Sequence, residues 1–280
     1  MPAFVPANPA LGLQAGLAVK AVTIFPDNPG QNLPVIQGAV LVFDPANGKS
    51  LALMDGAAMT AIRTGAGSGV ATDMLARPES RTLAIIGAGA QALTQIQGIC
   101  AVRQIDEVWL FDHNADRAER LAETMANSPD LPRRVNVLSD AAEAVMHADI
   151  VCTATTSRHE VFPHKSVRAG THINAIGAYR PDMREISAAT LANSRLFVDS
   201  RTSCLAEAGD ILQAIKEGAI APGHIAGEIG EVIAGTLRGR EFADQITVFK
   251  SVGMAVQDAA AASAALANAR AQGIGKVVDW

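Results

Sequence analysis

The spacing of apolar residues changes near residue 77, and this change suggests two structural units. Ahead of it, apolar runs are separated by short turns and predict strands of an antiparallel or mixed sheet. These runs are Leu17–Phe25, Val35–Phe43 and Lys49–Met54. The following stretch, Gly56–Ala76, predicts a helix that Pro78 ends.

From Ser80 onwards, strand-like and helix-like segments alternate, as in proteins whose parallel sheet is covered by helices. The predicted strands are Thr82–Ile86, Glu107–Phe111, Arg134–Val137, Ile150–Ala154, Thr171–Ala175 and Leu196–Val198. The predicted helices are Ala90–Val102, Ala115–Asn127, Ala141–His147, Ala188–Ala192 and Ala206–Glu217. This order predicts an α/β fold with a doubly wound parallel (Rossmann) sheet beside a smaller α+β domain.

We place the two domains at residues 1–76 and 77–251. An alanine-rich stretch, Met254–Ala271, predicts a final helix. Because such a helix often leaves the nucleotide domain to pack elsewhere, we expect residues 252–280 to join the first domain.

A glycine turn follows the first strand of the parallel sheet. Ile86 is followed by the pattern G-x-G-x-x-A, and Asp112 closes the next strand. This arrangement is typical of dinucleotide binding, because the helix N-terminus attracts phosphates and the acid accepts from a ribose. The predicted cofactor-binding residues here are Gly87, Gly89, Ala90, Gln91 and Asp112. The negative charge of Asp112 favours NAD (NADH), although nearby His113 and Arg117 leave NADP possible. The alternative is a glycine turn that binds no nucleotide.

Composition narrows the possible partners. A net charge of −5 argues against nucleic acid and against a membrane surface, and no apolar run is long enough for a membrane span. The N-terminal segment does not resemble a secretory signal, and Cys100, Cys152 and Cys204 are widely spaced. These features predict a cytoplasmic protein with reduced thiols. The histidines lack metal-ligand spacing, so we expect no metal.

Several segments together resemble the ornithine cyclodeaminase/mu-crystallin family. They are Lys20–Asn28, Leu53–Gly56, Thr60–Ala66, Ile86–Ala92, Ile173–Ile186 and Phe249–Gly253, and they cover nearly the whole chain in the family's order. The resemblance implies NAD(P)-dependent chemistry on small amino or imino acids. It also implies a homodimer joined through the first domain, which would bind the substrate.

Two basic residues of the first unit are candidates for substrate binding. Lys20 interrupts an apolar strand, and a buried ammonium group needs a partner, although an edge strand would leave it in water. Arg63 lies among small residues that would let a ligand approach, with an ion pair to Asp73 as the alternative. The resemblance implies that both bind the substrate carboxylate, that Lys20 is also catalytic, and that Thr64 contacts a phosphate or ribose.

The remaining candidates lie near the carboxyl edge of the parallel sheet, where ligands bind in this architecture. By resemblance, Asp182 handles the proton at the substrate nitrogen, as a carboxyl group within hydrogen-bond reach can do. A surface ion pair with a neighbouring arginine is the alternative. The resemblance also implies cofactor contacts by Thr153, Gly177, Ala178 and Ser251.

The start of the chain departs from the family. Members usually carry a further segment, with a substrate-binding arginine, before the stretch that matches Met1–Ala3. Either the given sequence begins inside a longer protein or its substrate domain is reduced.

Taken together, the sequence predicts an oxidoreductase that acts on the CH–NH or C=N bond of a small amino or imino acid. Within this class it favours a ketimine reductase such as a Δ1-pyrroline-2-carboxylate reductase. Three alternatives stay open: an ornithine cyclodeaminase, an alanine-type amino-acid dehydrogenase, and a non-catalytic binding protein like mu-crystallin.

Overall fold

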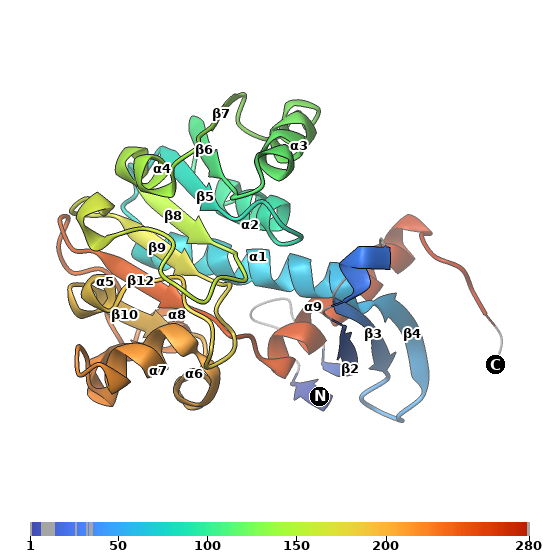
Figure 1. Cartoon of the computed structure of the whole chain (residues 1–280). Coiled ribbons are helices and arrows are strands. Elements are labelled where there is room, and N and C mark those ends of the chain that lie inside the picture. Colours follow the sequence, from blue (N-terminus) through green and yellow to red (C-terminus); the bar gives the residue numbers. More distant parts are fainter. Residues whose placement is uncertain (1, 7–14, 26, 32, 34–35, 279–280) are drawn as a thin grey trace. The chain divides into compact units, whose positions relative to one another are not determined.

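The computed structural model describes residues 2–6, 15–25, 27–31, 33 and 36–278. Two compact units are present: Met1–Arg63 with Met254–Trp280, and Thr64–Gly253 (Figure 1). The division falls inside helix α1 (Gly56–Leu75), whereas sequence patterns place it after this helix. The reason is packing, because Leu75 at the end of α1 lies in a core with Phe197 and Phe249 of the second unit.

The first unit is a four-stranded antiparallel sheet with the order β1-β2-β3-β4. Its strands are β1 (Pro2–Val5), β2 (Gly16–Ile24), β3 (Ile36–Phe43) and β4 (Ser50–Asp55), with a 3-10 turn at Asn28–Gln31. Strand β1 was not expected, and Val35, the first residue of one predicted run, lies outside the described residues. Helix α9 (Ala255–Gln272) packs on this sheet through Ala259 and Ala262.

The second unit contains an eight-stranded, fully parallel sheet with the order β11-β10-β12-β9-β8-β5-β6-β7, which confirms the doubly wound fold (Figure 1). Its strands are β5 (Thr82–Ile86), β6 (Glu107–Phe111), β7 (Arg134–Val137), β8 (Ile150–Thr153), β9 (His172–Ala175), β10 (Arg195–Val198), β11 (Ile225–Glu228) and β12 (Thr247–Lys250). The six predicted strands are all present. Strands β11 and β12, of four residues each, were not predicted.

Helices cover both faces of this sheet. They are α2 (Ala92–Cys100), α3 (Ala115–Ala126), α4 (Ala141–His147), α5 (Ala188–Ala192), α6 (Arg201–Glu207), α7 (Gly209–Lys216) and α8 (Ile229–Ile233), with 3-10 turns at His164–Ser166 and Pro222–His224. The predicted helix Ala206–Glu217 is therefore wrong as a single element. Ala208 has an extended backbone that ends α6 and begins α7.

Strand β5 is buried on both faces of the sheet, as its alternating side chains show. Ala84 and Ile86 belong to one buried cluster, and Leu83 and Ile85 belong to another. The continuous apolar sequence of this strand therefore follows from burial on both faces. Among the described residues, no helix is long and apolar enough to span a membrane.

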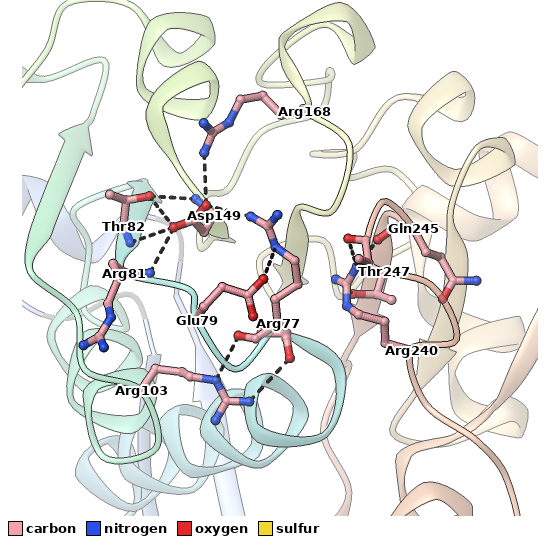
Figure 2. A network of polar contacts seen from close by, with 12 residues as sticks. Arg77, Glu79, Arg81, Thr82, Arg103, Asp149, Arg168, Arg240, Gln245 and Thr247 are labelled. Carbon is pink, nitrogen blue, oxygen red and sulfur yellow. Dashed lines mark hydrogen bonds and ion pairs between the residues drawn. The ribbon is translucent and has the colours of Figure 1, made fainter.

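A network of arginines fixes the end of α1 near the amino edge of the sheet (Figure 2). Arg103 and Arg240 donate to backbone carbonyls at the end of α1, which satisfies acceptors that a helix leaves unpaired. Asp149 accepts from Thr82 and pairs with Arg77 at 2.8 Å. Burial alone would raise the pKa of Asp149, but these hydrogen bonds and the Arg77 charge together lower it.

We expect Asp149→Ala to lower the free energy of unfolding by about 2–4 kcal/mol, because several hydrogen-bond donors lose their acceptor. Urea unfolding at neutral pH measures this change. Asp130→Ala, at an exposed position, is the matched control and should stay within about 0.5 kcal/mol of the parent. Equal stabilities for the two variants would show that the network contributes little.

Candidate active site

The glycine turn after β5 has the backbone that its sequence requires. Gly87 has a φ of 103°, in the left-handed region, and its amide donates to the Phe111 carbonyl at 2.8 Å. A Cβ atom on Gly87 would lie 2.8 Å from the Ala154 oxygen and from a Thr155 methyl group. Both the conformation and the close packing therefore require glycine here.

Open space lies beyond this turn, at the N-terminus of α2. Within the described parts of the chain, and apart from Gly89 and its two sequence neighbours, no atom lies within 4 Å of the position that a Cβ on Gly89 would take, and both Gly89 and Ala90 are exposed. Gln91 is the N-cap of α2 but makes no capping hydrogen bond, and its buried Oε1 has no hydrogen-bond partner within the described parts of the chain. An accessible helix N-terminus of this kind fits a pyrophosphate.

Asp112 connects this turn to the end of β6. Its carboxylate accepts from the amides of Ala88 at 2.8 Å and Asn114 at 2.9 Å, and its side chain is almost fully buried. A carboxylate has about four acceptor sites, so Asp112 keeps the capacity to accept from ribose hydroxyls. The residues of this turn therefore fit an adenine dinucleotide.

Glu185, which sequence reasoning missed, joins the carboxyl ends of β8 and β9. It accepts from the Thr153 hydroxyl at 2.9 Å and from the amides of Thr155 and Gly177 at 2.6 Å. A Cβ atom on Gly177 would overlap with the Thr155 backbone and the Glu185 carboxylate. The next residue, Ala178, is buried. Glycine at position 177 is thus required by packing within the chain, and the Thr153 proton is directed to Glu185.

The surroundings of Glu185 are also charged. Its amide donates to Asp210, which pairs with Lys250 at 3.0 Å, and the side chains of this pair are fully buried. Burial raises the pKa of Glu185, the Lys250 charge lowers it, and the Asp210 charge raises it again, so the pKa lies above its ordinary value. This buried cluster holds the carboxyl edge of the sheet together.

Ser251 follows β12 and is held by a buried acid. Its hydroxyl donates to Asp199 at 2.7 Å, and the same carboxylate oxygen accepts from the amides of Val252 and Gly253. The hydroxyl oxygen of Ser251 can still accept a hydrogen bond from a ligand.

Asp182 lies in the segment between β9 and α5, with 42% of its side chain exposed. It pairs with Arg180 at 3.1 Å and with Arg158 at 3.3 Å. These contacts match the surface ion pair that the sequence leaves as an alternative, and they fix the orientation of the carboxylate.

In the first unit, the structure brings Lys20 and Arg63 together around an acid of α9. Lys20 Nζ lies 2.8 Å from Asp258 Oδ2 and 3.2 Å from the Thr60 hydroxyl. Arg63 Nε lies 3.3 Å from Asp258 Oδ1, and Arg63 Nη1 donates to Gln257 at 3.0 Å. The side chains of Lys20, Asp258 and Arg63 are only 6%, 4% and 11% exposed.

Two small residues of α1 serve helix packing. Gly65 and Gly69 lie against the backbone of Thr94 and Gly98 on α2, at distances that leave no room for a side chain. At these two positions the glycines permit close helix packing and do not open space for a ligand, whereas a Cβ on Gly67 of the same stretch would have no described atom within 4 Å apart from its sequence neighbours and its own helix backbone. The neighbouring Thr64 is buried.

Several of the predicted site residues fall into three groups, while Asp182 pairs with arginines and Ser251 with Asp199. Lys20 and Arg63 share Asp258 in the first unit, while Gly87, Gly89 and Asp112 form the glycine turn of the second. Thr153 and Gly177 share Glu185. Within the described part of the chain, no group of three or more histidines, cysteines or acids is placed to hold a metal ion.

Comparisons with known proteins support the fold and show the family. Residues 3–273 match the ornithine cyclodeaminase/mu-crystallin family. A Δ1-pyrroline-2-carboxylate reductase of Bacillus cereus is 39% identical over 272 residues, which are 97% of this chain and 82% of the relative. The Δ1-pyrroline-2-carboxylate reductase of Thermococcus litoralis, solved with NADH and L-proline, has a TM-score of 0.89 and 43% identity, covering 94% of this chain and 81% of that protein. An archaeal alanine dehydrogenase dimer with bound NAD has a TM-score of 0.87 and 30% identity, covering 100% and 88%.

Proposed function

Because the chain belongs to the ornithine cyclodeaminase/mu-crystallin family, we propose that it is an NADH-dependent reductase of small cyclic imino acids. Δ1-Pyrroline-2-carboxylate is the proposed substrate, and a proline is then the product. The likeness to a reductase solved with NADH and L-proline supports this choice. The single observation that carries the proposal is the nearly buried pair of cations, Lys20 and Arg63, in a chain similar to Δ1-pyrroline-2-carboxylate reductases.

The two cations suit the carboxylate of the substrate. An arginine fork can bind a carboxylate through two parallel hydrogen bonds, and a lysine adds a compact positive charge beside it. Both side chains are already held by Asp258 and its helix, so little rotamer entropy is lost when the substrate binds. We assign carboxylate binding to this pair, with Lys20 also facing the imine.

The cofactor residues are assigned from the glycine turn. Gly89, Ala90 and the N-terminus of α2 would hold the pyrophosphate, and Asp112 would accept from the adenosine ribose. Bound NADH supplies a hydride to the carbon of the C=N bond. The protein then has to manage one proton at the nitrogen, which we assign to Asp182.

The remaining assignments concern the assembly. We propose that the first unit binds substrate and joins two copies into a homodimer in the cytoplasm, while the second binds the cofactor. The exposed apolar side chains Val22, Ile24 and Leu53 on the first unit's sheet support an interface there. Light scattering on the purified protein tests the dimer, and a monomer at micromolar concentration would contradict it.

A substrate panel tests the proposed function. NADH oxidation is followed with Δ1-pyrroline-2-carboxylate, with Δ1-piperideine-2-carboxylate, and with pyruvate plus ammonia, alongside NAD-dependent loss of ornithine. The expected result is the highest kcat/KM with a cyclic imine and a preference for NADH over NADPH. Fastest turnover with pyruvate and ammonia, or ornithine loss without imine reduction, would overturn the substrate assignment.

Arg63→Lys separates geometry from charge at this site. The variant keeps the positive charge but loses the fork, so we expect KM for the imine to rise about tenfold with little change in kcat. Steady-state kinetics measures this effect. Arg270→Lys, at an exposed position on α9, is the control and should leave KM unchanged. An unchanged KM for Arg63→Lys would contradict bidentate binding.

A further inference from the structure

One acid lies between the two cations that we assign to the substrate carboxylate. Asp258 is in the first turn of α9, where the partial positive charge of the helix N-terminus favours an acidic side chain. One of its carboxylate oxygens lies 2.8 Å from Lys20 Nζ, and the other lies 3.3 Å from Arg63 Nε. Asp258 is therefore the shared partner of two residues from β2 and α1.

The charges explain why an acid is needed here. Lys20 and Arg63 are both nearly buried, so their like charges would repel each other strongly without an anion between them. With Asp258 ionised, the three side chains sum to one positive charge. This charge matches one substrate carboxylate, whereas two uncompensated cations would be costly to bury.

The charged and polar groups that contact Lys20 in the described residues come from helices α1 and α9. Helix α1 contributes Arg63 and the Thr60 hydroxyl, and α9 contributes Asp258. Strands β1 and β3 contain no ionisable side chain, and the carboxylate of Asp55 in β4 accepts from the Ala58 amide. Burial and the Arg63 charge lower the pKa of Lys20, while Asp258 opposes both effects.

We propose that Asp258 is a positioning residue that keeps Lys20 protonated and holds Lys20 and Arg63 side by side to receive the substrate carboxylate. This inference rests on the proposed function for its link to catalysis. Its electrostatic part concerns the first unit alone and can be measured without turnover.

Replacing the acid should have a defined effect on pH dependence. In Asp258→Asn, the effect of Asp258 that raises the pKa of Lys20 is lost while burial and Arg63 still lower it, so this pKa falls further. Carboxylate binding is lost as the pH rises through that pKa, because the neutral amine no longer attracts an anion. The rise of KM with pH should therefore begin at least about one pH unit lower than in the parent. A shift of one unit corresponds to a loss of only about 1.4 kcal/mol in the attraction between Asp258 and the charged Lys20.

The experiment compares the pH profiles of kcat and KM in Asp258→Asn, Asp258→Glu and the control Asp27→Asn, an exposed acid of the same unit. We expect KM at neutral pH to rise about tenfold or more in Asp258→Asn, with a smaller change in kcat and an unchanged Kd for NADH. Asp258→Glu should restore most of the binding and move the profile back. A profile of Asp258→Asn that coincides with that of Asp27→Asn would overturn the proposal.

A second measurement does not depend on activity. The chain has six lysines, so NMR of lysine labelled at the side-chain ε-carbon can follow Lys20, identified by the signal missing in Lys20→Met. A lower titration midpoint in Asp258→Asn than in the parent supports the proposal even if no imine is reduced. If Asp258→Asn does not fold, the parent and Asp258→Glu carry the test, and a Lys20 that is neutral at pH 7 in both proteins would overturn the proposal.

Discussion

Asp182→Asn should lower kcat for imine reduction by about 100- to 10,000-fold, the usual contribution of a positioned general acid. KM and the Kd for NADH should change little, because the substitution removes a proton carrier and leaves the binding groups intact. Asparagine is close in size to aspartate, so the fold should tolerate it. Stopped-flow kinetics with saturating NADH measures the chemical step directly.

The ion pairs of Asp182 make this test informative. Arg158 and Arg180 hold the carboxylate of Asp182, which is consistent with a fixed proton carrier and equally with a surface ion pair. Asp106→Asn, at another exposed position of the same unit, is the control. A kcat of Asp182→Asn within about threefold of this control would correspond to less than half the free energy of a tenfold effect. That result would show that Asp182 forms only a surface ion pair and that another group must handle the proton.

Gly89→Val should raise the Kd for NADH by more than about 100-fold, because a branched side chain would occupy the space assigned to the pyrophosphate. Stability should change by less than about 1 kcal/mol, because among the described residues only the sequence neighbours of Gly89 come within 4 Å of the added Cβ. Fluorescence titration of NADH and thermal unfolding measure the two quantities separately.

The matched control is Gly223→Val, in the 3-10 turn before β11. An added Cβ on Gly223 would likewise have only sequence neighbours within 4 Å among the described residues. It should bind NADH as the parent does. Unchanged NADH binding in Gly89→Val would place the pyrophosphate elsewhere and remove the basis for the cofactor assignment.

The sequence predicts the glycine turn after β5 well because its requirements are local. Gly87 needs a left-handed backbone, and the open space beside Gly89 follows from the same short segment. The strand before the turn is buried on both faces, so its apolar run is unambiguous. Strands β11 and β12 are different, because they are defined by their pairing in the sheet: β11 pairs with β10, and β12 pairs with β10 and β9.

The side chains that support the site are hidden from the sequence for another reason. Asp258 sits in an alanine-rich helix, and nothing nearby in sequence shows that it meets Lys20, 238 positions away. In the sequence, Glu185 resembles an ordinary surface acid beside Arg184. Only the structure shows that it accepts hydrogen bonds from residues at the ends of β8 and β9. Such partners are defined by tertiary packing, whereas Lys20 was detectable because one charge interrupts an apolar strand.

The most direct test of the whole account is the stoichiometry of one reaction. Purified protein is mixed with NADH and Δ1-pyrroline-2-carboxylate, and both the loss of NADH absorbance and the formation of L-proline by chiral chromatography are measured. The account predicts equal molar amounts of NADH consumed and L-proline formed, with both lost in Gly89→Val. Binding of NADH without its oxidation in the presence of Δ1-pyrroline-2-carboxylate would contradict it.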